Sequence, residues 1–259
     1  MVKKILSIIA WVITGAALIV LFVYAHKGFT NAPLQGVVFN LERQGDKGFV
    51  EKDTVIANIE DLCGIRNHAS IGSVDLMKIQ KLLSNSPWIE SSSAFIGLND
   101  TLMISAKEYI PIVRIFNKKG QSVYVTRDGA ILPSNKIYTP RLIIANGNFE
   151  FPTSDSSAQL SDTSYAESGI SETLAITKAV LADDFLRGSI GQIYRNERKQ
   201  YEIMVNSLPA RVIVGDTVNI KQKMSRLHTL LEKHSGTDEL LGYKTLDLRY
   251  NNQIVCTKK

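Results

Sequence analysis

The chain has 259 residues, of which 44% are hydrophobic and 21% charged, and a formal net charge of +5. This length is sufficient for one large or two small domains with hydrophobic cores, and the composition is that of a globular protein. The positive charges are dispersed, so they do not indicate a nucleic-acid-binding patch, and the two cysteines, Cys63 and Cys256, are too far apart to form a metal-binding motif.

An apolar segment from Ile5 to Ala25 contains no charged residue and no proline. As a helix it would be ~31 Å long, which matches the ~30 Å hydrocarbon core of a membrane. A helix also satisfies its own backbone hydrogen bonds, as a segment in lipid must. We therefore expect residues 5–25 to form a transmembrane helix that binds the lipid bilayer. The alternative is a cleaved signal peptide, with Val23-Tyr24-Ala25 as the cleavage site.

Positive charge is unevenly distributed around this segment. Lys3 and Lys4 precede it, whereas only Lys27 and Arg43 follow it closely. The positive-inside tendency predicts a cytoplasmic tail at residues 1–4, a polar linker at residues 26–33 and an exported remainder. The opposite orientation would leave the remainder in the cytoplasm. In an oxidising compartment the two cysteines could pair, although two unpaired buried cysteines explain their number equally well.

Residues 34–110 show the pattern of a compact α+β unit. The expected order is strand, helix, helix, strand, strand, with both helices on one face of a small sheet. Strands are expected at residues 34–43, 88–98 and 101–109. The apolar stripes of the two helices are expected to be Val55, Ile56, Ile59 and Leu62, and then Val74, Met77, Leu82 and Leu83. The first helix is expected to end at Gly64, and the second to be capped by Ser73 and to end before Pro87.

From residue 111 the pattern changes to short strands and turns, typical of a mostly antiparallel β domain with two further helices. Strands are expected at residues 112–116, 121–126, 130–132, 141–145, 192–195, 200–205 and 211–214, and helices at 171–186, capped by Ser171, and at 219–234. Residues 146–170 are polar and are expected to form a mobile loop with little to bury. Residues 244–257 are expected to form a hairpin in which an Asn251-Asn252 turn places Val255 opposite Leu248.

The sequence contains no recognisable catalytic motif. It lacks the G-x-S-x-G elbow, the P-loop and the G-x-G-x-x-G fingerprint, and His228 and His234 do not have the i, i+4 spacing of a helical zinc pair. We therefore expect no enzymatic activity, no catalytic residue, no cofactor and no metal. A catalytic site assembled from distant residues would not be visible by spacing.

The hairpin at the end of the chain indicates an interaction surface instead. If nothing covers its last strand, the unpaired backbone groups of that strand can accept a partner strand. Tyr250 would offer a partner an apolar ring with a polar hydroxyl, and Arg249 a guanidinium with several hydrogen-bond donors. The alternative is an inner strand whose side chains only fill a core. The candidate partner-binding residues are Arg249, Tyr250, Asn252, Gln253, Ile254, Val255 and Cys256.

Five short motifs carry a resemblance to a known family. They are Ser86-Pro87-Trp88-Ile89; Thr101-Leu102-Met103-Ile104 with Glu108 and Pro111; Val123-Tyr124-Val125 with Asp128-Gly129 and Pro133; Val214-Gly215-Asp216; and Leu246-Asp247-Leu248-Arg249-Tyr250. Their order and spacing resemble the bacterial cell-division protein family FtsQ, called DivIB in some lineages.

This resemblance implies that residues 34–110 form a POTRA domain, a protein-docking module, and that residues 111–259 form the β domain of the family. It implies a non-enzymatic scaffold of the divisome at the septum of the cytoplasmic membrane. The implied partners are FtsB-type and FtsL-type proteins and other divisome membrane proteins, with no nucleic acid and no small-molecule substrate. A partner strand would add beside the last strand, at Arg249, Tyr250 and residues 252–257.

Two features depart from the family pattern. Residues 146–170 match no segment of the family, and the chain lacks the aromatic residue that some members carry near the carboxyl terminus. Two other functions also remain open. One is a membrane-tethered enzyme of the cell envelope, and the other is a POTRA adaptor for protein export or outer-membrane assembly.

Overall fold

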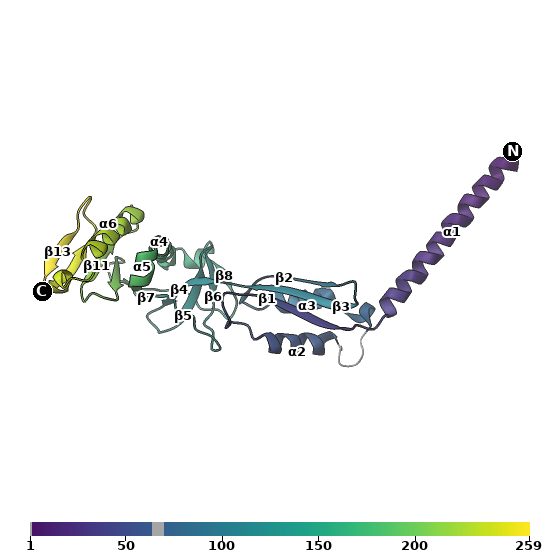
Figure 1. Ribbon diagram of the computed structural model, residues 1–259, viewed down its shortest axis with the longest axis horizontal. Coiled ribbons are helices and arrows are strands. Elements are labelled where there is room, and N and C mark those ends of the chain that lie inside the picture. The colour runs from purple at the N-terminus through teal and green to yellow at the C-terminus, as the bar shows by residue number, and fades with distance from the viewer. Residues whose placement is uncertain (1, 64–69) are drawn as a thin grey trace. The chain divides into compact units, whose positions relative to one another are not determined.

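The computed structural model describes residues 2–63 and 70–259, and the chain divides into two compact units (Figure 1). The N-terminal unit comprises residues 1–43 and 50–108, and the C-terminal unit comprises residues 44–49 and 109–259. Residues 44–49 belong to the second unit because Phe49 packs edge-on against Tyr124 and Tyr138, with ring centroids 5.4 Å apart in both pairs. Helices and strands occur in both units, so the protein is of the mixed α+β class, with six α-helices in its described residues.

The first helix, α1 (Val2–Asn31), contains the predicted apolar segment. Its part Ile9–Asn31 is long and apolar enough to cross a membrane, and a signal sequence would meet the same criterion. None of these residues is buried by the rest of the protein, as expected of a helix whose side chains face lipid. The helix continues to Asn31, so most of the connection at residues 26–33 is helical.

The rest of the N-terminal unit is a three-stranded sheet with two helices. The strands are β1 (Gly36–Glu42), β2 (Ile89–Ile96) and β3 (Thr101–Glu108), in the order β1-β3-β2, with β1 parallel and β2 antiparallel to β3. The helices are α2 (Lys52–Cys63) and α3 (Leu76–Ser84), and a short 3-10 helix, η2 (Ile71–Ser73), precedes α3. One core joins the sheet to both helices and includes Phe39, Ile59, Ile79, Leu83 and Leu102. The predicted order of elements is thus confirmed.

Three details of the predicted helices were wrong. The cap of α3 is Asp75, whose carboxylate accepts a hydrogen bond from the Lys78 N–H at 3.0 Å, whereas Ser73 belongs to η2. The face of α3 that packs on the sheet buries Ile79 and the predicted Leu83, whereas Met77 is 81% exposed. In α2, Leu62 lies outside the core. The predicted end of α2 at Gly64 lies outside the described residues.

The C-terminal unit contains one ten-stranded sheet. Its strands are β4 (Pro111–Phe116), β5 (Ser122–Thr126), β6 (Ala130–Leu132), β7 (Ile143–Gly147), β8 (Ala158–Gln159), β9 (Ile190–Arg195), β10 (Tyr201–Val205), β11 (Arg211–Gly215), β12 (Tyr243–Asp247) and β13 (Val255–Lys258). Their order is β13-β12-β11-β10-β9-β7-β4-β5-β6-β8. Most neighbours are antiparallel, and the parallel pairs are β4–β7, β7–β9 and β11–β12. The predicted mostly antiparallel architecture is confirmed.

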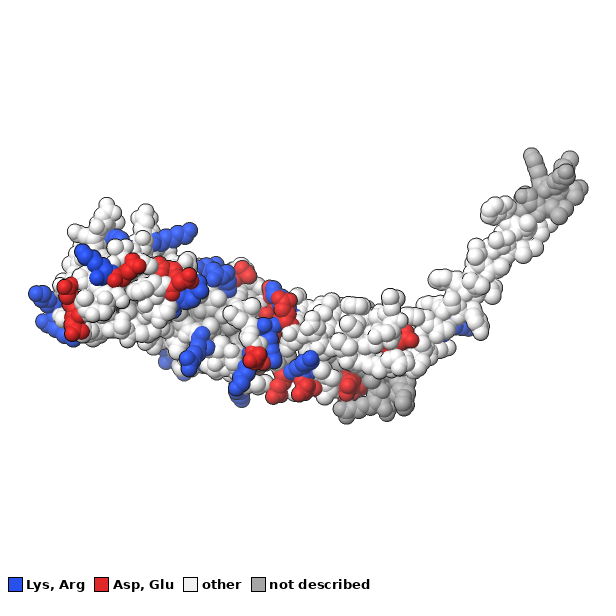
Figure 2. Space-filling view, viewed as in Figure 1, with Lys and Arg blue, Asp and Glu red and all other residues white. Residues whose placement is uncertain are grey.

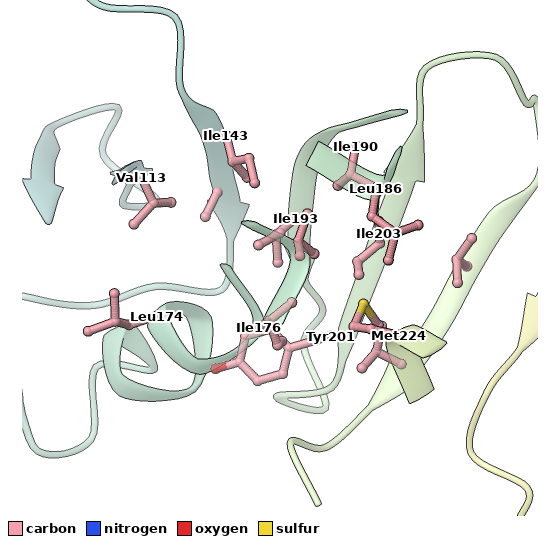
Figure 3. Packing of buried hydrophobic residues seen from close by; sticks show 14 of the residues in the cluster. Val113, Ile143, Leu174, Ile176, Leu186, Ile190, Ile193, Tyr201, Ile203 and Met224 are labelled. Atoms are coloured by element: carbon pink, nitrogen blue, oxygen red, sulfur yellow. The ribbon is translucent and has the colours of Figure 1, made fainter. Parts of the chain in front are cut away.

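Three helices pack on this sheet: α4 (Ile170–Leu181), α5 (Asp184–Ser189) and α6 (Ile220–Lys233). Two short 3-10 helices, η3 (Thr163–Tyr165) and η4 (Glu239–Gly242), complete the unit. The core brings Ile176 of α4 and Met224 of α6 together with the strand residues Ile193, Tyr201 and Ile203 (Figure 3). The helical spacing in α6 predicts an apolar stripe of Ile220, Met224, Leu227, Leu230 and Leu231. Met224, Leu227 and Leu231 are buried, and Ile220 and Leu230 are half-buried against the same core.

The single helix expected at residues 171–186 is in fact two helices. Gly169, with φ +82°, precedes α4, which ends at Leu181. The Asp183 carboxylate then accepts a hydrogen bond from the Leu186 N–H at 3.0 Å and so caps a new helix, α5. A side chain that satisfies a free N–H group favours a helix start at this position, which the apolar periodicity alone does not reveal.

The segment at residues 146–170 buries more than its composition suggests. It contributes β8 and η3, and it buries the rings of Phe149 and Tyr165 in the core. The Arg195 guanidinium donates to the Asn148 carbonyl at 2.5 Å and stacks on the Phe149 ring. The expectation that this segment has little to bury was wrong, because two aromatic residues among many polar ones suffice to attach it.

Candidate functional site

The ten-stranded sheet ends at β13 on one side and at β8 on the other. β8 has only two residues. β13 pairs with β12, and within the described residues it has a strand neighbour on that side only. An edge strand presents N–H and C=O groups that another strand can pair with. The long edge of this sheet is therefore at the end of the chain, where the sequence places the candidate residues.

The register shows which backbone groups face outward. The Lys259 N–H donates to the Gly242 carbonyl next to β12 at 3.1 Å. Alternate residues of an antiparallel strand bond to the same neighbour, so Thr257 and Val255 also face β12. The N–H and C=O groups of Cys256 and Lys258 then point to the open side of the sheet. These two residues offer the positions at which a partner strand could bond.

The predicted register of the hairpin was wrong by one residue. Val255 lies opposite Asp247, not Leu248, and Cys256 lies opposite Leu246. The connection therefore comprises residues 248–254, which we call the 248–254 loop, and is not a two-residue turn. Leu248 is buried and its N–H donates to the Ile213 carbonyl of β11 at 2.9 Å. The Leu248 N–H therefore bonds to β11 and not to β13.

A single arginine on α6 holds the 248–254 loop. The Arg226 guanidinium donates hydrogen bonds to the carbonyls of Tyr250, Gln253 and Leu248, with distances of 3.0 Å to Gln253 and 3.1 Å to Leu248. These carbonyls would otherwise depend on water. Sequence analysis missed Arg226, because it is one of several charges on the polar side of an amphipathic helix, and backbone acceptors carry no residue-specific signal.

Arg249 is held by its neighbour Asp247 and by a glycine. Its guanidinium donates to both carboxylate oxygens of Asp247, Nε to Oδ1 at 3.0 Å and Nη2 to Oδ2 at 2.6 Å. Burial alone would raise the pKa of Asp247, but the hydrogen bonds from Arg249 outweigh it and lower that pKa below its usual value. A Cβ at Gly215 would lie 2.8 Å from the Arg249 Cγ, so only glycine leaves room for the arginine stem.

Of the seven candidate residues, Val255 and Cys256 lie in β13, and the other five lie in the 248–254 loop that connects β12 to β13. Arg249, Asn252, Gln253 and Val255 are exposed, and Tyr250 is 48% exposed. Ile254 and Cys256 are half-buried and pack against the core, so they contribute support as well as surface. Cys256 has a free thiol, and burial raises its pKa. The side chain of Cys63 lies outside the described residues, so the predicted possibility that the two cysteines pair lies outside them as well.

A polar depression of about 420 Å³ lies beside the loop. Its lining comes from the 248–254 loop, from α6 and from the segment before α6: Asp216, Val218, Asn219, Gln222, Lys223, Ser225, Arg226, Arg249, Asn251 and Asn252. Within it, the Lys223 ammonium is buried and donates to the Val214 and Asp216 carbonyls and to the Asp216 carboxylate at 2.8 Å. The hydrogen bond from Lys223 lowers the pKa of Asp216. The Lys223 charge is thus balanced within the protein, and the depression is polar.

Both histidines of the C-terminal unit lie beside carboxylates. His228 of α6 lies 2.7 Å from the Asp183 carboxylate, which caps α5, and 3.2 Å from Glu232. His234 lies 2.6 Å from Glu239 of η4. Across residues 2–63 and 70–259, no three His, Cys, Asp or Glu side chains are grouped as metal ligands. The His228 pair joins two helices, which is sufficient reason for its presence.

The His228→Gln substitution is expected to cost more stability in acid than in base. The hydrogen bond to Asp183 raises the pKa of His228 above its usual value, and the charge of Glu232 adds to this rise. A raised pKa in the folded state means that the stabilisation is fully present below the usual histidine pKa and is lost as the pH rises through the raised value. Urea unfolding of both proteins at about pH 5.5 and about pH 8.5 would measure it. The Asp183→Asn variant should lose the same dependence, and an equal cost at both pH values would contradict this account.

Comparison with known proteins identifies one matching family. A family model described as FtsQ/DivIB, C-terminal related matches residues 110–257. No curated protein matches the chain. The matched range covers more than half of the chain, spans the sheet from β4 into β13, and includes all seven candidate residues.

Proposed function

The chain belongs to the FtsQ/DivIB, C-terminal related family, and we propose that it is a membrane-anchored, non-enzymatic scaffold of the bacterial cell-division complex. The observation that carries this proposal is the open edge strand β13 beside the 248–254 loop. A scaffold of this kind needs a surface that a partner chain can recognise, and an ordered edge strand is such a surface.

The proposed mechanism is strand addition beside β13. A segment of an FtsB-type partner, together with an FtsL-type partner, would extend the sheet by bonding to Cys256 and Lys258. Tyr250 would give an amphipathic contact, and the outer side of the Arg249 guanidinium would meet an acidic group. Because Arg226 already orders the loop, less conformational entropy is lost when the partner binds.

The N-terminal unit has two proposed roles. Residues 5–25 would hold the chain in the cytoplasmic membrane with its amino terminus inside, which raises the local concentration of the exported units near other anchored proteins. Residues 34–110 would act as a POTRA domain that docks further membrane proteins of the division complex. The order β1-α2-α3-β2-β3 supports that assignment.

A fluorescent fusion of the full chain is expected to concentrate at the septum of dividing cells. The physical reason is that a scaffold is held where its partners are, whereas the anchor alone diffuses in the membrane. A fusion that carries only residues 1–33 is the matched control and should be uniform along the envelope. A uniform distribution of the full-length fusion would refute the division role and favour an adaptor for protein export.

A further inference from the structure

The outer face of the three-stranded sheet changes from apolar to charged along the strands. Rows of cross-strand neighbours on this face are, from the start of β1, Val38–Met103–Phe95, Asn40–Ser105–Ser93 and Glu42–Lys107–Ser91. The residues between them, such as Phe39, Leu102 and Ile104, are buried against α2 and α3 on the other face. Val38 and Phe95 are about half exposed, at 47% and 53%. The apolar row is thus on the surface and at one end of the sheet.

The apolar end of the sheet is the end that adjoins α1. Only four residues separate the end of α1 from β1. The Gln35 N–H donates to the Asp100 carbonyl in the β2–β3 turn, and the Ile71 N–H donates to the Ala32 carbonyl, both at 2.9 Å. A Cβ at Gly72 would lie 2.9 Å from the Thr30 carbonyl oxygen. Backbone contacts therefore fix the β2–β3 turn and η2 close to the end of α1.

The β2–β3 turn carries a fully exposed leucine, Leu98. An exposed leucine at a turn is unfavourable in water. The turn follows directly on the end of the sheet that carries the apolar row, since a Cβ at Gly97 would lie 3.4 Å from the Met103 Cγ. Phe29, near the end of α1, is also exposed. On the face shown in Figure 2, few charged side chains lie on the part of the N-terminal unit nearest α1. The same turn also carries the polar residues Asn99 and Asp100, so this end of the unit is suited to the interface between lipid and water.

We propose that the bilayer that holds α1 also covers this end of the sheet, with Leu98 inserted at the lipid interface and the Val38–Met103–Phe95 row against it. The proposal rests on the membrane anchor of the proposed function. Beyond Ala25, α1 continues for six residues, about 9 Å. That length is close to the roughly 5–7 Å of headgroup region that each leaflet adds to the hydrocarbon core.

The increase in polarity along the strands supports lipid as the occupant. A membrane presents an environment that changes from apolar to aqueous with distance, and the rows on the sheet change in the same order away from α1. The last row includes Lys107, which pairs with Glu90 at 2.9 Å and belongs in water. Contact with lipid would fix the direction in which the N-terminal unit extends from the membrane.

The test places a fluorescent label on the full chain in lipid vesicles. Both native cysteines are replaced by serine, and the Leu98→Cys variant is labelled with an environment-sensitive dye in vesicles of phosphatidylethanolamine and phosphatidylglycerol. The Ser91→Cys variant is the matched control, because Ser91 is exposed on β2, which leads into this turn, but lies about 20 Å from position 98. At position 98 we expect blue-shifted emission that nitroxide-labelled lipids quench, and at position 91 neither effect.

Flotation of the vesicles separates failure of this inference from failure of the anchor. If the chain floats with the vesicles and the label at position 98 reports water, the inference is overturned while the anchor stands. If the emission is blue-shifted but lipid nitroxides do not quench it, a protein or a second copy covers this end, which also overturns it. If the chain does not float, the anchor fails and the inference fails with it.

Discussion

The Cys256→Pro substitution is expected to weaken the binding of a partner strand by about 30-fold or more, equivalent to about 2 kcal/mol, while the sheet stays folded. The Cys256 N–H points to the open side of β13, as the Lys259–Gly242 bond and the alternation of the strand require. Proline removes this donor and places its ring where the partner backbone must approach, but proline is tolerated on edge strands when its nitrogen faces outward. The affinity for the exported segment of an FtsB-type partner, measured by calorimetry, reports the effect.

Two variants make this result specific. Cys256→Ala removes the side chain but keeps the N–H, so its affinity should stay close to that of the wild type. Thr257→Pro removes a donor that faces β12 and should lower the free energy of unfolding. If Cys256→Pro bound the partner as tightly as Cys256→Ala, strand addition at β13 would be wrong, even if the protein is a division scaffold.

The Arg226→Ala substitution is expected to lower the free energy of unfolding by about 2 kcal/mol and to weaken partner binding as well. It removes the three hydrogen bonds to the carbonyls of Leu248, Tyr250 and Gln253. Hydrogen bonds from a charged donor are stronger than neutral ones, but Arg226 is only half-buried, which reduces their net effect. Partner affinity falls because the released 248–254 loop must then be ordered on binding.

Urea unfolding and hydrogen exchange of the 248–254 loop measure these effects. Lys221→Ala is the matched control, because it removes a positive charge from an exposed position of the same helix. Arg226→Lys should be intermediate, since one ammonium group cannot reach three carbonyls with the fork of a guanidinium. A loop that exchanges at the same rate in Arg226→Ala and in the wild type would show that α6 does not hold it.

Local patterns in the sequence correctly predicted much of the architecture. The apolar segment at residues 5–25 predicts a long helix because helix length and hydrophobicity are local properties. The stripe from Ile220 through Met224 and Leu227 to Leu230 and Leu231 predicts α6 for the same reason. Predictions failed where a side-chain bond decided an element boundary, as when Asp75 and Asp183 started new helices.

The sequence by itself determined the class of the protein, its apolar helix, the order of strands and α-helices in the N-terminal unit, and the position of the candidate residues near the carboxyl terminus. Only the tertiary structure decided that β13 is an edge, that Val255 lies opposite Asp247, and that Arg226 holds the loop. The physical reason is that apolar periodicity is a property of residues that are neighbours in the sequence. Strand order, and the hydrogen bonds of an arginine to distant backbone carbonyls, depend instead on contacts between segments far apart in the chain. Those contacts carry no local pattern.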